Sequence, residues 1–492
     1  MMSFLLLPEV QLTLWAVLLL VVDACRKDVP TQEVTRMALL GLALVFVGTW
    51  LLPKDGSVSG LISQLYALDP LALFFKRFFL VAAFLVVWMA GEHAGQLPVA
   101  RNEFLILPLF TTVGMLLLAS ARDFMTLFVA LELVTISFYV LVAYQRDKAA
   151  SLEAGTKYLV IGALSTGFLV YGIAFLFGVV GSTSFQALEV HLVSQPVTPA
   201  LLFGMLLVMA GLGFKLAAVP FHVWAPDVYQ GAPTPVSAFL SVASKAAGVV
   251  AVLRLFAFNG FNNEILLPYT STTFAVLGAA TALLGNLAAL PQRNIKRMLG
   301  YSSIGNAGFI LMGVSCLDYR GVEAVLLYLC VYLLATLLAF FIVTLLGRDA
   351  GSEDVPQLAG LYHRSPLLAF GLMIALVSLA GIPPLAGFLG KLGIFSAVWN
   401  SRLHHEWLLV PAIIGAVAGL YFYLGPVRAM FWNEPQREAS VLPLKPSSKF
   451  LVGVLAAALV VLGFWQQPLA DVIYPVLKRP APSAAQTAVT QP

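Results

Sequence analysis

Residues 213–245 read GFKLAAVPFHVWAPDVYQGAPTPVSAFLSVASK, and this stretch places two lysines, Lys215 and Lys245, inside long apolar runs. A third lysine, Lys391, ends the apolar stretch LAGIPPLAGFLGK at 379–391. An ammonium near the centre of a bilayer costs about 2.5–3.5 kcal/mol on insertion scales, so three of them cost on the order of 8–10 kcal/mol. Because ionisable groups inside membranes usually mark ion or proton pathways, the lysines predict a chain that moves ions or protons.

The composition indicates a polytopic membrane protein. Hydrophobic residues make up 60% of the 492 residues and charged residues only 11%, whereas a soluble domain is about 25% charged. The net charge of +4 is small, and we attribute it to membrane topology rather than to nucleic-acid binding. The cysteines are scattered and form neither a metal-binding spacing nor a disulfide framework.

About fourteen apolar segments are long enough to cross a bilayer, which takes roughly 20 residues. They lie near residues 4–24, 36–52, 71–90, 102–120, 123–143, 157–180, 199–219, 235–257, 270–290, 298–316, 322–346, 365–381 with 385–400, 407–430 and 449–466. We therefore expect an all-α fold of about fourteen transmembrane helices. Basic residues are more frequent in the loops after odd-numbered spans, so the positive-inside rule places both termini outside.

Two of these spans are expected to be broken helices. Pro220 follows Lys215 in the seventh span, and Pro383 and Pro384 precede Lys391 in the twelfth. Proline removes a backbone donor, and in lipid the freed carbonyls need partners inside the protein. Because paired broken helices point to ion sites in transporters with inverted repeats, the fourth to eighth and the ninth to thirteenth spans are expected to form two inverted five-helix repeats.

The spans also predict how the chain is divided. We expect an N-terminal three-helix segment at 1–100, a first five-helix repeat at 101–258, a second five-helix repeat at 259–432, a C-terminal helix at 433–475 and a tail at 476–492. The tail is rich in proline and alanine and has few apolar residues to bury, so it is expected to be disordered.

Glu132 lies in the middle of the fifth span, in FMTLFVALELVTISFYVLV at 124–142. A nearby lysine would favour its ionised form, and burial opposes it. A Glu–Lys pair beside a second lysine makes a series of coupled titrations, which is a physical means of moving protons. The alternatives are a static ion pair for Glu132 and Lys215, a side chain of Lys245 that reaches the interface, and a helix-end position for Lys391.

His222 follows the break in the seventh span and is a further candidate, because histidine titrates near neutral pH and suits proton entry. A capped loop histidine is an equal alternative. We interpret Asp227 as a loop or helix-end residue. The small polar residues of NIKRMLGYSSIGNAGF at 294–309 either line a hydrated path or hold membrane helices together, and the second interpretation is favoured.

Several motifs of energy-converting proteins are missing from the sequence. It has no Walker A loop, no GxGxxG in a soluble βαβ unit and no CxxC cluster for iron–sulfur. We therefore expect no cofactor and no metal in this chain. Its energy is expected to come from an ion gradient or from a partner.

Six stretches of the sequence resemble the antiporter-like membrane subunits of respiratory complex I. They are DPLALFFK at 69–76, ALELVTISFYVLVAY at 130–144, SLEAGTKYLVIGALSTG at 151–167, the 213–245 stretch, NIKRMLGYSSIGNAGF at 294–309 and LAGIPPLAGFLGK at 379–391. The resemblance covers nearly the whole chain. The resemblance is greatest to the chain N type of bacterial NADH:quinone oxidoreductase, the counterpart of mitochondrial subunit 2.

The resemblance implies a proton-translocating subunit whose broken helices are the seventh and twelfth. It implies that Glu132 and Lys215 are the family's Glu–Lys pair, that Lys245 is the connecting lysine and that Lys391 is the terminal lysine. Asn306 stands where many relatives carry histidine, and because asparagine does not titrate, we assign it no proton-carrying role.

The resemblance also implies partners and a location. NADH, FMN, iron–sulfur clusters and quinone are expected in partner subunits, and the neighbouring membrane-arm subunits and the lipid of the bacterial inner membrane are expected around this chain. Three alternatives stay open: a cation/proton antiporter, a membrane subunit of a related hydrogenase or ferredoxin-dependent complex, and a purely structural subunit of the membrane arm.

Overall fold

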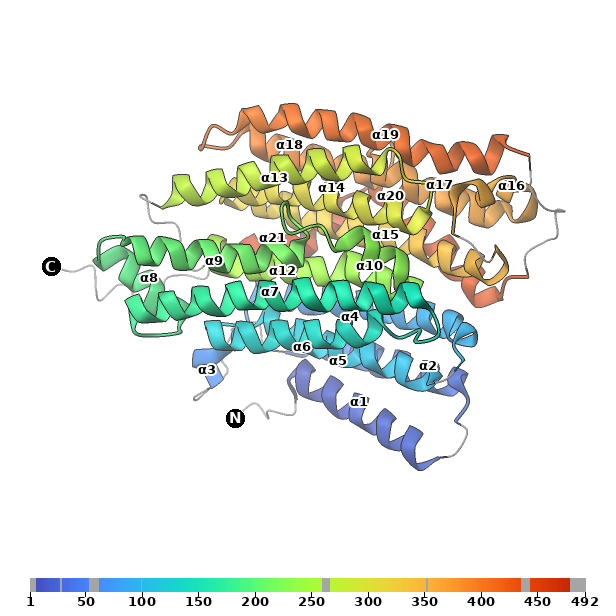
Figure 1. Cartoon of the computed structure of the whole chain (residues 1–492), viewed down its shortest axis with the longest axis horizontal. Helices are drawn as coiled ribbons and strands as arrows, with labels where there is room; N and C mark the ends of the chain where they lie inside the picture. The colour runs from blue at the N-terminus through green and yellow to red at the C-terminus, as the bar shows by residue number, and fades with distance from the viewer. Residues whose placement is uncertain are drawn as a thin grey trace.

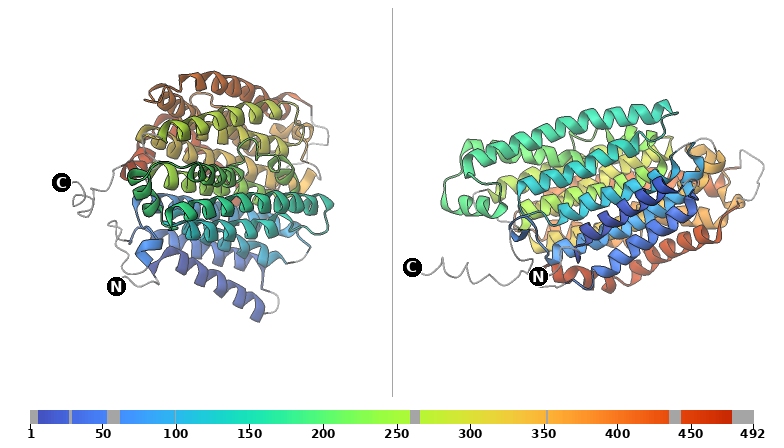
Figure 2. Two further views of the ribbon diagram at one scale, coloured as in Figure 1. Left: turned by 60° about the vertical axis from the view of Figure 1, so that its left-hand side comes forward. Right: turned by 90° about the horizontal axis from the view of Figure 1, so that it is seen from below.

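The helices of the computed structural model run roughly parallel to one another (Figures 1 and 2). The structure describes residues 6–26, 29–52, 62–98, 100–258, 266–350, 353–434 and 443–477. Within these residues there is no β-sheet, and only isolated bridges join loop residues. The predicted all-α fold is therefore confirmed, while the predicted tail lies, from residue 478 on, outside the described residues.

The helices of the first half are α1 (Pro8–Cys25), α2 (Thr31–Gly48), α3 (Ile62–Leu65), α4 (Pro70–His93), α5 (Arg101–Ala119), α6 (Phe124–Val142), α7 (Ala149–Val180), α8 (Phe185–Ser194), α9 (Pro199–Leu216), α10 (Ala225–Gly231), α11 (Thr234–Phe239) and α12 (Lys245–Val252). Two π-helical turns, η3 (Leu240–Ser244) and η4 (Leu253–Phe258), flank α12.

The helices of the second half are α13 (Leu267–Ala289), α14 (Ile295–Ser315), α15 (Tyr319–Ala350), α16 (Leu361–Arg364), α17 (Pro366–Ala380), α18 (Ala386–Trp399), α19 (Leu409–Trp432), α20 (Pro446–Phe464) and α21 (Gln467–Leu477). Single 3₁₀ turns occur at η2 (Ala94–Gln96), η5 (Val355–Leu358) and η6 (Glu406–Leu408).

Capping side chains at the ends of the spans fix where several helices begin. Asp69, Asp123 and Asn294 each accept a hydrogen bond from the backbone N–H three residues later, at 2.8, 2.5 and 3.1 Å. Each bond satisfies one of the N–H groups that the first turn of a helix leaves unpaired. These caps start α4, α6 and α14, and the last two of these helices carry residues of the candidate site.

The set of membrane spans agrees with the sequence prediction. Twelve helices of the described residues are long and apolar enough to cross a membrane. Together with α14, whose first turn carries Lys296 and Arg297, and the broken pair α17 and α18, they make up the fourteen predicted spans. The chain is thus a multi-pass membrane protein.

Some boundaries differ from the prediction. The sixth span begins at Ala149 rather than near residue 157, because the polar residues ahead of its apolar run continue the helix. The short helices α8 and α21 were not predicted, since neither has an apolar run that could cross a membrane. The π-helical turns of the eighth span leave no signature in the sequence.

The two five-helix repeats pack in the same way. In the first repeat α5 packs on α6, and both halves of the seventh span, α9 and α10, pack on α7. In the second repeat α13 packs on α14, and both halves of the twelfth span, α17 and α18, pack on α15. The N-terminal helices α1, α2 and α4 pack against α5, and α1 lies at the lower edge of Figure 1.

Both predicted breaks are present. Between α9 and α10, residues 217–224 are not helical and include Pro220; Ala217 at the end of α9 is left-handed, with φ 52°. Between α17 and α18, Gly381 has φ 84°, a conformation that glycine adopts without a steric penalty. Pro383 and Pro384 follow it. Each break therefore divides a membrane span into two half-helices.

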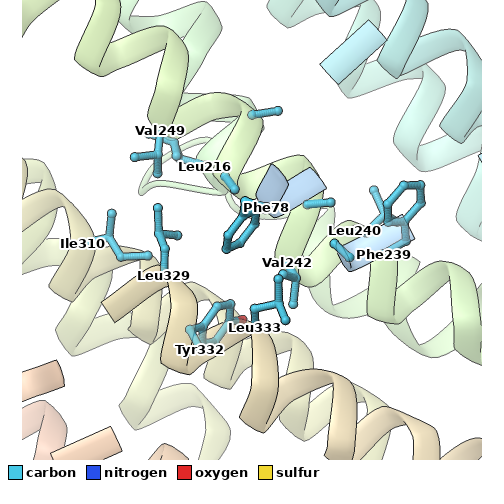
Figure 3. Packing of buried hydrophobic residues seen from close by; sticks show 14 of the residues in the cluster. Phe78, Leu216, Phe239, Leu240, Val242, Val249, Ile310, Leu329, Tyr332 and Leu333 are labelled. Atoms are coloured by element: carbon cyan, nitrogen blue, oxygen red, sulfur yellow. The ribbon is translucent and has the colours of Figure 1, made fainter. Parts of the chain in front are cut away.

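The eighth span lies at the centre of the core. Every residue in its most apolar window is buried. Figure 3 shows Val242 and Val249 of this span together with Leu216 of α9, Ile310 of α14 and Leu329 of α15, all members of one hydrophobic cluster. A charged side chain on this span is consequently surrounded by protein.

Candidate functional site

The three lysines lie beside the irregular points of their helices. Lys215 is in the last turn of α9, directly before the first break, and Lys391 is in the second turn of α18, after the second break. Lys245 is the first residue of α12 and directly follows the π-helical turn η3. The three residues are 5%, 5% and 1% exposed, respectively. Because π-helical turns are rare and often occur at functional sites, the adjacent turn η3 supports a functional role for Lys245.

Lys215 contacts α6, the helix that carries Glu132. Its ammonium donates a hydrogen bond to Oγ1 of Thr135, almost one turn after Glu132. Glu132 is half-buried and accepts a hydrogen bond of 2.7 Å from Oγ1 of Thr166 on α7. Glu132 and Lys215, both in the described part of the chain, are thus not joined by a direct ion pair. Their charges interact electrostatically, with Thr135 as the direct partner of the ammonium.

Lys245 connects the first repeat to the second. Its ammonium donates a hydrogen bond to the backbone carbonyl of Ser303 on α14. The hydroxyl of Ser303 lies 3.1 Å from the hydroxyl of Tyr229 on α10, the second half of the broken seventh span. The lysine is therefore held by a neutral acceptor and has no carboxylate partner among its hydrogen bonds. Burial without an opposite charge makes the protonated form costly.

Polar side chains continue from Lys245 toward the twelfth span along one side of α14. Asn306 donates a hydrogen bond of 3.3 Å to the hydroxyl of Tyr423 on α19 and accepts one of 2.7 Å from the hydroxyl of Tyr328 on α15. Ser302 bonds the same Tyr423 hydroxyl. We call this set the polar row; its members are Tyr229, Ser302, Ser303, Asn306, Tyr328 and Tyr423. All six are buried.

Lys391 ends this path at the second break. Its ammonium donates hydrogen bonds to the carbonyls of Leu379 at 2.8 Å and Ala380 at 3.0 Å, the last residues of α17. These are the carbonyls that the break leaves without helical partners, and the negative end of a helix dipole lies there. Gly390 has no side chain, so the ring of Tyr328 lies against the backbone next to Lys391. The polar row therefore extends to the residue beside the terminal lysine.

The remaining predicted candidates lie apart from this path. His222 is half-buried in the non-helical segment between α9 and α10, and its Nδ1 is buried without a hydrogen-bond partner. No hydrogen bond joins it to the three lysines. Asp227 on α10 forms ion pairs with Lys157 at 2.6 Å and Arg297 at 2.5 Å, so it ties α10 to α7 and α14.

The sequence did not point to Thr135 or to the tyrosines of the polar row. Thr135 lies one turn after Glu132 on α6. This spacing places both side chains on one face of the helix, so the sequence could have indicated Thr135 as a neighbour of Glu132. Tyr328 and Tyr423 stand in ordinary apolar spans of α15 and α19. Only the tertiary packing brings them to Asn306.

Comparison with known proteins gives consistent matches. Residues 121–417 match the family described as NADH:quinone oxidoreductase/Mrp antiporter, TM. A protein of Heliobacterium modesticaldum named NADH-quinone oxidoreductase subunit N is 41% identical over 450 residues, which cover 91% of this chain and 93% of the relative. A protein of Roseiflexus castenholzii named NADH-quinone oxidoreductase subunit N 2 is 40% identical over 476 residues, 94% of each chain.

Solved structures agree with this assignment. A chain of respiratory complex I from Thermus thermophilus is 34% identical, with a TM-score of 0.78, over 96% of this chain and 99% of that one. A chain of the Mrp complex from Dietzia is 20% identical, with a TM-score of 0.83, over 97% of each chain. At that identity the second likeness shows the fold alone.

The buried lysines, the two broken spans and the paired repeats define an antiporter-like membrane subunit. The chain belongs to the NADH:quinone oxidoreductase/Mrp antiporter family. Within that family, the relatives that it resembles over nine tenths of its length carry the name NADH-quinone oxidoreductase subunit N.

Proposed function

We propose that this chain is a proton-translocating subunit in the membrane arm of a proton-pumping NADH:quinone oxidoreductase. In this proposal the complex is a translocase, and the chain supplies part of its proton path. NADH, FMN, iron–sulfur clusters and quinone are bound by partner subunits, and this chain holds no redox centre. The chain lies in the bacterial inner membrane with both termini outside and packs against other membrane-arm subunits.

The observation that carries the proposal is the alignment of three buried lysines on two interrupted spans and the central span. The polar row places buried hydroxyl and amide groups between Lys245 and the neighbourhood of Lys391, in two hydrogen-bonded groups: Tyr229 with Ser303, and Asn306 with Tyr328 and Tyr423. Such a row has no purpose for redox chemistry, but it suits proton transfer, because hydroxyls can both donate and accept.

Each lysine has a distinct role in this proposal. Glu132 modulates the charge of Lys215 from the neighbouring turn of α6. Lys215 and Lys245 hold protons in the central part of the membrane. Lys391, bound to carbonyls at the break, exchanges protons at the far end. His222 is a candidate for proton entry beside the first break.

A cation/proton antiporter subunit and a membrane subunit of a hydrogenase-type or ferredoxin-dependent complex are the alternatives. The fold does not separate these classes, since the Mrp chain shares it at 20% identity. The identity of about 40% to proteins named subunit N favours the NADH:quinone oxidoreductase. A purely structural subunit is disfavoured by the cost of three buried ammonium groups.

The test is to purify the complex through an affinity tag on this chain and to assay it in proteoliposomes. The proposal predicts NADH:quinone turnover coupled to proton uptake into the vesicles. Turnover with reduced ferredoxin but not with NADH would favour a membrane subunit of a ferredoxin-dependent complex. Sodium–proton exchange by a preparation without any redox activity would contradict the proposal and favour an antiporter.

A further inference from the structure

A second group of buried ionisable side chains lies outside the path described above, where α1 and α4 begin. The carboxylate of Glu9 and the ammonium of Lys76 form an ion pair of 2.6 Å. The hydroxyl of Tyr66 lies 3.0 and 3.2 Å from the two oxygens of Glu9 and accepts a hydrogen bond from Lys76. We call these three residues the N-terminal triad. Every member bonds both of the others.

The triad is deeply buried. Lys76 has no exposed surface, and Glu9 and Tyr66 are 4% and 7% exposed. The burial of Lys76 was not predicted, since this residue stands near the start of its span, where a lysine usually reaches the interface. The neighbouring Arg77 lies outside the triad: it donates a hydrogen bond to Thr49 and stacks on the ring of Trp50 at 3.7 Å.

A small apolar cluster encloses the triad and is separate from the main core. Its buried members are Leu7, Leu52, Tyr66, Leu68 and Leu73, with Val10 packed against them. These side chains come from the beginning of α1, from the end of the α2 region and from the beginning of α4. Tyr66 thus belongs both to this cluster and to the triad, which lies near one end of the bundle.

A second ion pair connects the triad region to the helix of Lys245. Arg254 in η4 binds both carboxylate oxygens of Asp69, at 2.6 and 2.8 Å, and also donates to the carbonyl of Ala119 at the end of α5. The charges of Asp69 and Arg254 both act on Lys76. Arg254 follows Lys245 by nine residues, about 13 Å along one helix. The helix that carries Lys245 therefore also carries a charge that acts on the triad.

Structural stabilisation explains this arrangement poorly. Taking two charges out of water costs several kcal/mol each, and well-packed apolar residues commonly stabilise a buried site as well as an ion pair does. A tyrosine hydroxyl that bonds both charges adds a route for a proton between them, because it donates to one partner while it accepts from the other.

We propose that the N-terminal triad is an additional proton-exchange site of this chain, serving the membrane face at which α1 begins. This inference rests on the proposed function. In the exchange, Lys76 passes a proton through the Tyr66 hydroxyl to Glu9, giving a neutral amine and a carboxylic acid. Glu9 then releases its proton to water at that face, and the neutral amine of Lys76 takes up another from water that reaches the triad from the other side. One proton enters and one leaves, and the net charge returns to its starting value.

The test compares Glu9→Gln/Lys76→Met and Tyr66→Phe in the purified, assembled complex. The double substitution removes both charges together, so no lone charge is left buried. Tyr66→Phe keeps the ion pair and its direct contact and removes only the proton route through the hydroxyl. Both are expected to assemble and to pump at least about tenfold more slowly, since relay groups typically contribute 10²–10⁴. Arg77→Met, on the same helix but outside the triad, is the control and is expected to pump normally.

Normal pumping by an assembled double variant would overturn the inference and leave the triad as a static ion pair. Should the double variant fail to assemble, Tyr66→Phe decides, and its normal pumping would overturn the proposed proton transfer through the Tyr66 hydroxyl. Lys215→Ala in the same preparation separates the two proposals. If it abolishes pumping while the triad variants pump normally, only the additional site is wrong; if it pumps normally, the proposed function fails.

Discussion

The three lysines of the path are held by different kinds of acceptor, and this difference predicts how easily each one gives up its proton. Lys245 and Lys391 bind backbone carbonyls, which cannot leave or titrate. Lys215 binds the hydroxyl of Thr135. A neutral amine keeps N–H groups that can donate to any of these acceptors, but only a hydroxyl can also rotate and donate to the amine nitrogen. The Thr135 hydroxyl, which now donates to the carbonyl of Leu131, is the acceptor that can change role when Lys215 loses its proton.

Replacing Thr135 with valine is expected to slow proton pumping about tenfold, since the loss of a buried hydrogen bond to a charged group costs roughly 1.5–3 kcal/mol. The charged form of Lys215 would then lack an acceptor at this position. Thr135→Ser keeps the hydroxyl and should pump like the parent. The measurement is the initial rate of vesicle acidification at equal amounts of assembled complex. Equal rates for the valine and serine variants would show that Thr135 only packs.

Asn306 joins the hydroxyls of Tyr328 and Tyr423, so Asn306→Leu should interrupt the path between Lys245 and Lys391. The expected result is a fall in pumping of about tenfold or more, because an interrupted relay loses acid–base catalysis. The residue need not titrate itself to hold two hydroxyls in line. If Asn306→Leu assembles and pumps normally, the polar row serves helix association alone, as the sequence analysis favoured.

At the scale of the helices, the two breaks hold their lysines in different ways. At the first break the lysine ends the first half-helix and faces α6. At the second it lies on the second half-helix and reaches back to the carbonyls of the first. The second break therefore depends on close contact between α17 and α18.

Gly387 provides that contact. A Cβ at this position would lie 1.7 Å from the carbonyl oxygen of Ser378, whereas a Cβ at Gly393 on the same helix meets nothing closer than 3.8 Å. Gly387→Ala is therefore expected to push α18 away from α17, to weaken the hold on Lys391 and to reduce both assembly and pumping. Gly393→Ala is the matched control and should be neutral. The yield of intact complex from native gels and its pumping rate measure both effects. Similar behaviour of the two variants would contradict the described packing.

The sequence predicted well those elements that depend on residues close together in the chain. The prolines at 220, 383 and 384 predicted both breaks, and apolar length predicted the spans. The π-helical turns around α12 have no local cause, because LSVAS and LRLFAF at 240–244 and 253–258 read as ordinary helix. They arise where the eighth span is packed on all sides, so tertiary packing overrides propensity there.

For the whole molecule, the duplicated architecture explains why a charged path can exist in an apolar protein. Each repeat packs its broken span on its third span, α7 or α15, and the eighth span joins the two repeats at the centre. The sequence predicted which lysines are buried at the breaks and at the centre. It did not predict that Lys76 is buried, nor that tyrosines from α10, α15 and α19 meet α14. Those features depend on contacts between residues that are far apart in the chain.

The most direct test of the central claim is proton pumping and NADH:quinone turnover in membranes that carry Lys215→Ala, with assembly of the complex verified. The account predicts that pumping and coupled turnover fall at least about a hundredfold, the usual contribution of a relay group. Lys449→Ala, at the exposed start of α20, controls for loss of a lysine. Normal pumping by an assembled Lys215→Ala complex would contradict the account and leave a structural subunit as the better explanation.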